Sequence, residues 1–172
     1  MKKLILFILA AALIALPACS VQENASPELF IERLKKNNEN LIFESDSAFW
    51  EDNAWFCFAE DNNGTKFSFE IQTDENGNAK KISLACIQTD KAEEFFSAVK
   101  SIIKTYAPED DAEQAAQALI AEKSGFSYFE TQWHRYAFAK SESGLYFSAE
   151  SAKLVPQSDV PLSLKPNDIS PE

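Results

Sequence analysis

Three strand-like segments separated by two Asn-Gly turns constrain the fold of this chain most strongly. The segments are AWFCFAE (54–60), TKFSFEIQT (65–73) and AKKISLACIQ (79–88), and the connections between them read DNNG and DENGN. Asn followed by Gly is a strong short-range hairpin signal, because both residues tolerate the positive φ angles of tight turns. We therefore expect an antiparallel meander.

Turn positions also predict which side chains share a face of that meander. Centring the first turn on residues 62–64 pairs Phe58 with Phe67 or Phe69, and the second turn is centred on Asn76-Gly77. The predicted buried face comprises Phe56, Phe58, Phe67, Phe69, Ile71, Ile82, Leu84 and Cys86. The predicted opposite face carries Trp55, Cys57 and Ala59.

Two helices are expected around the meander. Ser26-Pro27-Glu28 supplies an N-cap, a proline at the first helical position and an acidic first turn, so a helix should run to about Asn38. Asp90 and Glu93 have the spacing of a capping box that opens a helix ending at Tyr106. Both segments carry an apolar stripe for packing on a sheet.

The second half of the chain repeats this alternation. A third helix should begin at Pro108, with its acidic turn at 109–111 explained by the helix dipole, and end near Lys123 before Gly125. Strand-like segments follow at 126–131, 133–140 and 145–151. The predicted class is α+β, with helices packed on one face of an antiparallel sheet.

An internal similarity connects the two halves. Residues 58–70 (FAEDNNGTKFSFE) match residues 138–150 (FAKSESGLYFSAE) at six of thirteen positions, with an offset of 80. One interpretation is a duplicated helix-plus-strands unit with halves 26–107 and 108–152. The other is two independent hairpins of similar composition.

The domain is expected to span residues 26–152. That length can bury a core without disulfides or metals. In residues 153–172 the prolines at 156, 161, 166 and 171 argue against a core, and we expect extended or disordered chain there.

The N-terminus reads as an export signal. Lys2 and Lys3 precede an uncharged apolar run from 4 to 16, which is shorter than the roughly 20 residues of a membrane-spanning helix. Leu16-Pro17-Ala18-Cys19 then resembles the lipobox of bacterial lipoproteins. The alternative is an ordinary secretory signal that is cleaved near a cysteine.

The lipobox resemblance implies a processed and acylated protein. Residues 1–18 would be removed, Cys19 would carry a diacylglycerol and usually an N-acyl chain, and residues 19–25 would form a tether. Since Ser20 is not the aspartate that retains such proteins at the inner membrane, the outer membrane is expected in a Gram-negative cell, and the outer face of the cell membrane otherwise.

Charge narrows the range of partners. Removing Lys2 and Lys3 with the signal leaves 14 basic and 27 acidic residues, a net charge of about −13. Nucleic acids and anionic headgroups are therefore excluded as main partners. The membrane would be contacted through the lipid on Cys19.

The two remaining cysteines are predicted to be unpaired. Cys57 and Cys86 fall on opposite faces of strands that a third strand separates, and two strand spacings, about 9–10 Å, exceed the roughly 7 Å limit between bridged Cα atoms. A bulge near Trp55 would shift the register and permit the bond.

Catalytic signals are weak, and no cofactor or metal is expected. His134 is the only histidine, so a metal site of several histidines is excluded, and we interpret it as a polar residue at a strand start. DENGN lacks the glycine and the final acid of a calcium loop, so it reads as a turn.

The function expected is a lipid-anchored, non-catalytic binding or scaffold module of the cell envelope, or periplasm, recognising a protein or polymer. Trp55 and Arg135 are the candidate binding face, unless a helix or the 46–53 loop covers them. One alternative is a small envelope hydrolase using acidic residues. Another is a purely structural tether.

Overall fold

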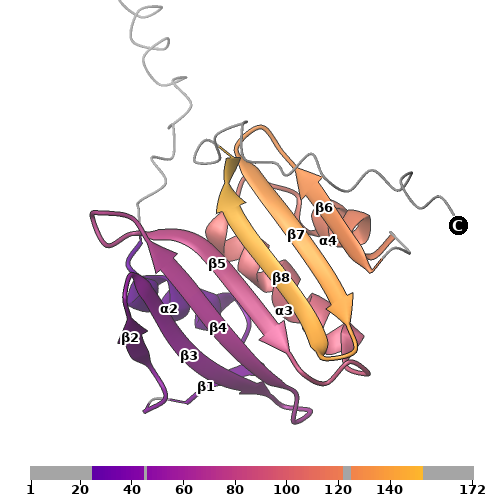
Figure 1. The fold of residues 1–172 in the computed structure, drawn as a ribbon, viewed down its shortest axis with the longest axis horizontal. Coiled ribbons are helices and arrows are strands. Elements are labelled where there is room, and N and C mark those ends of the chain that lie inside the picture. The colour runs from indigo at the N-terminus through magenta and orange to yellow at the C-terminus, as the bar shows by residue number, and fades with distance from the viewer. Residues whose placement is uncertain (1–24, 45, 122–124, 153–172) are drawn as a thin grey trace, which may run out of the picture.

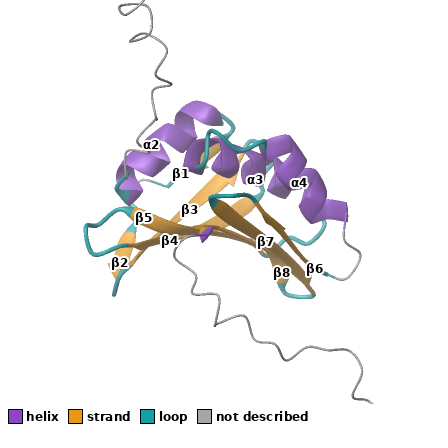
Figure 2. Cartoon of the chain, turned by 90° about the horizontal axis from the view of Figure 1, so that it is seen from above, coloured by secondary structure: helices purple, strands orange, loops and turns teal. Residues whose placement is uncertain are grey.

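The computed structural model describes residues 25–44, 46–121 and 125–152. Within these residues, eight strands form one antiparallel sheet and three helices lie on one of its faces (Figures 1 and 2). The helices are α2 (Pro27–Asn37), α3 (Ala92–Tyr106) and α4 (Ala112–Ala121). The strands are β1 (Leu41–Phe43), β2 (Phe49–Glu51), β3 (Ala54–Asp61), β4 (Lys66–Thr73), β5 (Ala79–Cys86), β6 (Phe126–Glu130), β7 (His134–Ser141) and β8 (Gly144–Ser151). The α+β prediction is confirmed.

Strand β5 joins the two halves of the chain into a single sheet. The strand order is β1-β3-β4-β5-β8-β7-β6, and the short strand β2 pairs with β3. Strands from the first half therefore lie on one side of β5 and strands from the second half on the other (Figure 1). The predicted loop over residues 46–53 contains β2, which is a correction to the sequence analysis.

Three helices are found where they were predicted, but the starts of α3 and α4 differ from the prediction. Helix α2 begins as predicted, with the hydroxyl of Ser26 accepting from the Leu29 amide. Helix α3 begins after Lys91 without a side-chain cap, so the predicted capping box is not made. Helix α4 begins at Ala112, four residues after Pro108, and the Asp111 carboxylate caps it by accepting from two backbone amides.

The register of β3 differs from the prediction by one residue. Phe58 lies opposite Ser68, and Ala59 lies opposite Phe67. These pairs are symmetric about residue 63, so the predicted turn over 62–64 is confirmed and only the pairing of Phe58 with Phe67 or Phe69 was wrong. The Asp61 carboxylate holds this turn by accepting from the backbone amides of residues 63 and 65 at 2.8 and 2.9 Å. A one-residue shift moves every side chain of a strand to the other face.

The face of the sheet that packs against the helices, here called the helix face, therefore has a different membership on β3. Its β3 residues are Trp55, Cys57 and Ala59, whereas Phe56 and Phe58 lie on the opposite, open face. On β4 and β5 the predicted buried residues are confirmed: Phe67, Phe69, Ile71, Ile82, Leu84 and Cys86. Helix α3 covers them with Phe95, Val99, Ile102 and Ile103.

Cys57 and Cys86 are unpaired, as predicted, although for a different reason. Both thiols lie on the helix face, so the expected placement on opposite faces is wrong. Strand β4 still separates them. Burial raises the pKa of the Cys57 thiol to about 12 and also raises the pKa of Cys86.

Residues matched by the offset of 80 occupy equivalent positions in the sheet on one pair of strands, β4 and β8, but not on β3 and β7. Phe67 and Phe147, at the offset of 80, are both buried on the two strands that flank β5. Phe58 and Phe138 are not equivalent, because Phe58 lies on the open face and Phe138 on the helix face. The β7–β8 hairpin closes with Ser141 opposite Gly144, a shorter connection than that between β3 and β4.

None of the helices within the described ranges is both long and apolar enough to span a bilayer.

Candidate functional site

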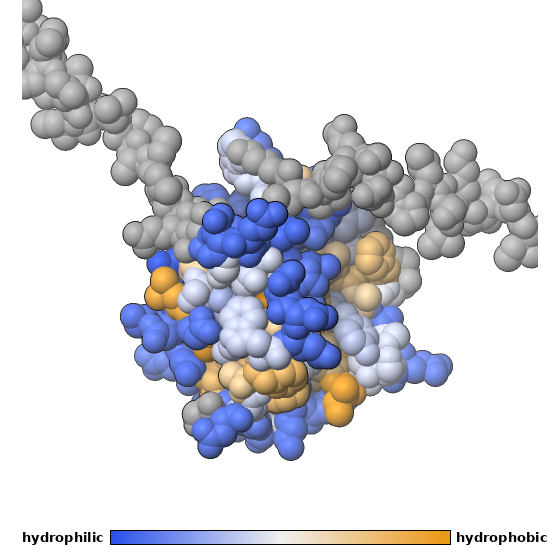
Figure 3. All heavy atoms as spheres, turned by 60° about the vertical axis from the view of Figure 1, so that its left-hand side comes forward, coloured by the Kyte–Doolittle hydropathy of each residue, from blue (hydrophilic) through white to orange (hydrophobic). Residues whose placement is uncertain are grey.

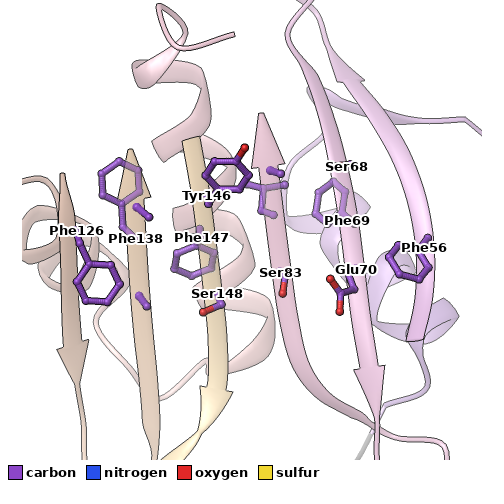
Figure 4. A pocket seen from close by; sticks show the side chains of 14 residues that line it. Phe56, Ser68, Phe69, Glu70, Ser83, Phe126, Phe138, Tyr146, Phe147 and Ser148 are labelled. Atoms are coloured by element: carbon purple, nitrogen blue, oxygen red, sulfur yellow. The ribbon is translucent and has the colours of Figure 1, made fainter. Parts of the chain in front are cut away.

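The open face of the sheet is concave, and none of the three helices of the described residues lies on it (Figure 2). In Figure 2 the sheet arches beneath the helices, so its edges lie farther from the helical layer than its centre. Side chains from β3, β4, β5, β6, β7 and β8 line a groove of about 460 Å³ on this side (Figure 4). We call it the sheet groove.

Small side chains form the floor of the sheet groove. Strand pairing aligns them in two rows that cross the sheet, one of which places Ser83 opposite both Glu70 and Ser148. The small floor residues are Ser68, Ser83, Ala85, Ala137, Ala139 and Ser148, and one larger side chain, Tyr146 on β8, stands between Ala85 and Ala139. Because these side chains are short, the curvature of the sheet is left as open volume.

Aromatic side chains form the two rims. Phe56 and Phe58 stand on β3, and Phe126 and Tyr128 stand on β6, where they are 56% and 66% exposed. Phe49 on β2 stacks on Phe56 with ring centroids 5.1 Å apart. Figure 3, which brings the β2 side of the molecule forward, shows apolar side chains exposed among hydrophilic ones.

The dimensions of the groove suit a peptide-sized ligand. Five strand spacings separate β3 from β6, which is about 24 Å between the rims, and the floor from β4 to β7 spans about 14 Å. A helix with its side chains is about 10–12 Å wide. An extended peptide or one helix would therefore fit between the rims.

Glu70 is the one carboxylate among the residues that line the groove. It lies opposite Phe56, and its Oε1 atom accepts from the side-chain amide of Gln72 at 2.7 Å. Among the described residues Glu70 forms no salt bridge. The groove thus combines an apolar floor and rims with a single oriented negative charge (Figure 4).

The residues predicted to form a binding face are not brought together. Trp55 is only 7% exposed, because the corrected register of β3 turns it to the helix face. Arg135 does lie on the open face, where it forms a salt bridge with Glu130 at 3.4 Å. Strands β4, β5 and β8 separate the two, and Cys19 lies outside the described residues.

The alternative that a helix or the 46–53 loop covers Trp55 is confirmed for the helical layer, under which Trp55 is buried, and corrected for the 46–53 segment. Residues 49–51 pair along the edge of β3 as strand β2, so this segment widens the sheet instead of lying across it. Phe49 extends the aromatic rim, and Trp50 lies opposite Trp55 at the sheet edge with its side chain exposed. The groove remains open between the rims.

A buried polar cluster was missed by the sequence analysis. The Asp110 side chain is only 8% exposed, and its Oδ2 atom lies 2.5 Å from the Tyr136 hydroxyl, 3.0 Å from Nδ1 of His134 and 3.1 Å from the Thr131 hydroxyl. Burial, and then the bond to Asp110, raise the pKa of Tyr136. Asp110 therefore has a tertiary role that the helix dipole does not describe.

This cluster is structural in character. It ties the turn before α4 to the β6–β7 connection, and its imidazole and phenol are almost excluded from solvent. Asp110 and His134 lie 24 residues apart, so the sequence gives only the presence of a lone histidine as a signal. Within the described residues, no group of three potential ligands could hold a metal ion.

A second hollow, of about 390 Å³, is lined by several acids between α3 and the β3–β4 loop. Asp61 is engaged in that loop's hydrogen bonds, and Glu94 pairs with Lys91 at 3.3 Å. Two of the three acids that line this hollow are therefore engaged in other interactions. Comparisons with protein-family models, curated proteins and solved structures find no match to the chain.

Proposed function

We propose that this chain is a lipid-anchored protein of the bacterial cell envelope that binds a partner, without catalysis, in the sheet groove. The observation that carries the binding role is the groove itself, a concave apolar surface with exposed aromatic rims. Monomeric proteins rarely leave a large contiguous apolar surface uncovered unless it contacts something. The lipid anchor rests on the resemblance of residues 16–19 to a lipobox.

The composition of the groove supports binding over a purely structural role. Phe and Tyr are enriched at protein interfaces because each gives a large contact area at a small entropic cost. Here most of them stand at the rims, and the floor between the rims is serine and alanine apart from Glu70 and Tyr146. A side chain or backbone of a partner could therefore enter the groove without displacing a core residue.

The anchor would keep the groove close to the membrane. Acyl chains on Cys19 contribute roughly 0.8 kcal/mol per buried methylene, so two or more chains hold a protein stably. Residues 19–25 extend at most about 25 Å. Ala25 is fixed to the sheet through its carbonyl oxygen, which accepts from the Ala79 amide at 2.8 Å.

The binding role is tested by crosslinking the full chain in cells and identifying what is captured. Ser148→Trp fills the middle of the groove floor, and Phe58→Ser removes part of one rim. Ile120→Ser is the matched control, because Ile120 is exposed on α4 in the helical layer. Capture that both groove variants abolish and the control retains would support the proposal, and capture unaffected by Ser148→Trp would refute it.

The anchor is tested separately by fractionation. Cys19→Ala removes the only residue that could be acylated at the lipobox, so the protein should move from the membrane fraction to the soluble fraction or remain unprocessed. Metabolic labelling with a fatty acid should be lost in the same variant. Unchanged labelling in Cys19→Ala would contradict the lipobox assignment.

A further inference from the structure

We propose that the segment bound in the sheet groove is a basic peptide, with an Arg or Lys side chain seated between Glu70 and the ring of Phe56. This inference rests on the proposed function and names the chemistry of the partner. Apolar residues beside the basic one would lie over the serine and alanine floor.

The charge of the groove is complementary to a basic segment. Glu70 is the single carboxylate in an otherwise uncharged groove lining, and no described residue neutralises it by a salt bridge. The bond from Gln72 holds the carboxylate in place. A charge is expensive to cover with an apolar partner, so a segment that closes the groove must bring a cation to this position.

The aromatic rim next to Glu70 presents a ring face to a cation. Phe56 lies directly opposite Glu70, and side chains of directly paired residues have Cβ atoms about 4.5–5.5 Å apart. Phe49 stacks on Phe56 at an interplanar angle of 14°, and it does so from β2, on the side of β3 away from β4. The other face of the Phe56 ring is thereby directed toward Glu70.

A guanidinium or ammonium group fits the space that these two side chains define. An Arg side chain can stack on a phenyl ring and donate to a carboxylate at the same time. A neutral side chain can donate to the carboxylate but brings no positive charge, and an acidic side chain is repelled by it. The pair Glu70–Phe56 thus selects a cation, and the floor selects the short or apolar residues beside it.

Other charges on the open face set the orientation of the bound segment. In the row next to Glu70, Lys81 lies opposite Gln72 and Glu150, and Arg135 lies opposite Glu150 and forms a salt bridge with Glu130 toward the β6 rim. Glu150 does not line the groove. Uncompensated negative charge inside the groove is therefore confined to the β3–β4 side. We expect the basic residue at that side and apolar residues toward Phe126.

The test uses the purified full chain and three synthetic nine-residue peptides. Each peptide has alternating Leu and Ala around one central residue, which is Arg, Gln or Glu, and binding is measured by fluorescence anisotropy. The Arg peptide should bind at least tenfold more tightly than the Gln peptide, and the Glu peptide should bind more weakly still. Glu70→Gln should remove the preference for Arg over Gln.

The control is Glu32→Gln, which makes the same change in net charge on exposed helix α2 and should preserve the preference. Phe56→Leu keeps the site apolar and should reduce Arg binding more than Gln binding. Equal affinity for the three peptides, or a preference that survives Glu70→Gln, would overturn the inference. Binding of the Arg peptide only after residues 153–172 are removed would also overturn it, by identifying that segment as the occupant.

Failure here is distinguishable from failure of the proposed function. If no peptide binds while crosslinking captures a partner that Ser148→Trp abolishes, the groove is a binding site for another chemistry. If the Arg peptide binds but Ser148→Trp has no effect on it, both proposals fail.

Discussion

Replacing Asp110 by alanine should destabilise the protein more than any other single loss of a polar side chain in the described residues. Asp110 accepts from Tyr136, Thr131 and His134 at one nearly buried oxygen. The alanine would leave the phenol and the imidazole without their partner in a site that excludes water. Hydrogen bonds to a charged acceptor each contribute about 1.5–3 kcal/mol, and removing one member of a buried cluster costs about 3–5 kcal/mol in all.

That magnitude is a large part of a typical free energy of unfolding of about 5–15 kcal/mol. Urea unfolding followed by circular dichroism should show a lower midpoint with an unchanged m-value. Tyr136→Phe removes the donor hydroxyl itself, so fewer buried polar groups lose their hydrogen-bond partner than in Asp110→Ala. It should lower the free energy of unfolding by only about 1–2 kcal/mol. Glu109→Gln is the control, because it removes a neighbouring carboxylate that is exposed and lies farther from His134, at 3.8 Å, than Asp110 does.

A double-mutant cycle decides whether the cluster acts as a unit. Asp110→Asn and Tyr136→Phe should show a coupling energy of about 1 kcal/mol or more, since the two side chains are in direct contact. An Asp110→Ala cost below about 1 kcal/mol, similar to that of Glu109→Gln, would refute the assignment of a stabilising role to this cluster.

Three further outcomes follow from burial and backbone geometry. The free energy of unfolding should fall as pH rises from about 9 to about 12, because the Cys57 thiol has a pKa of about 12 in the folded protein and near 9.0 when exposed. The raised pKa of Tyr136 acts in the same direction. In urea titrations at several pH values, Cys57→Ala should make the free energy of unfolding depend less steeply on pH. A thiol reagent should label neither Cys57 nor Cys86 in the native protein at pH 8 and both in urea, as peptide mapping would show. Gly144→Ala should lower the melting temperature more than Gly77→Ala. A Cβ atom at position 144 would lie 2.7 Å from the Cys86 carbonyl oxygen, whereas a Cβ atom at position 77 would have no neighbour within 4 Å. Equal shifts in melting temperature would contradict this reasoning.

The helices and strands could be predicted well from short sequence motifs, because caps and turns depend on residues that are close together in the chain. Ser26-Pro27 starts α2, and the Asn76-Gly77 turn fixes the β4–β5 register, so the buried residues of β5 could be assigned correctly. The start of α4 was misplaced because Asp111, and not a residue near Pro108, supplies the capping carboxylate.

The face assignment of β3 could not be read from hydrophobicity. Both faces of this strand are apolar, with Trp55 and Cys57 on one and Phe56 and Phe58 on the other. Ranking by hydrophobicity places the phenylalanines inside, whereas the turn centred on residue 63, which Asp61 holds, pairs Ala59 with Phe67 and leaves them outside. The sheet groove was missed for the same reason, since its β3 rim consists of side chains predicted to be core.

The Asp110 cluster could not be predicted because its members meet only in the folded chain. His134 and Tyr136 are ordinary alternating residues of a strand, and Asp110 lies in an acidic run that a helix start explains equally well. Their contact depends on how α4 packs against β6 and β7, which no local pattern specifies.

The pairing of β5 with β8 determines when the groove comes into existence during folding. Leu84 pairs with Phe147, so an edge of β5 stays bare until the last strand of the domain has been made. Contacts this distant in sequence form slowly, and a bare strand edge is prone to pairing with other chains. Since the groove floor takes residues from both sides of β5, no fragment that ends before β8 contains it. On the proposed function, binding therefore requires that β8 has docked.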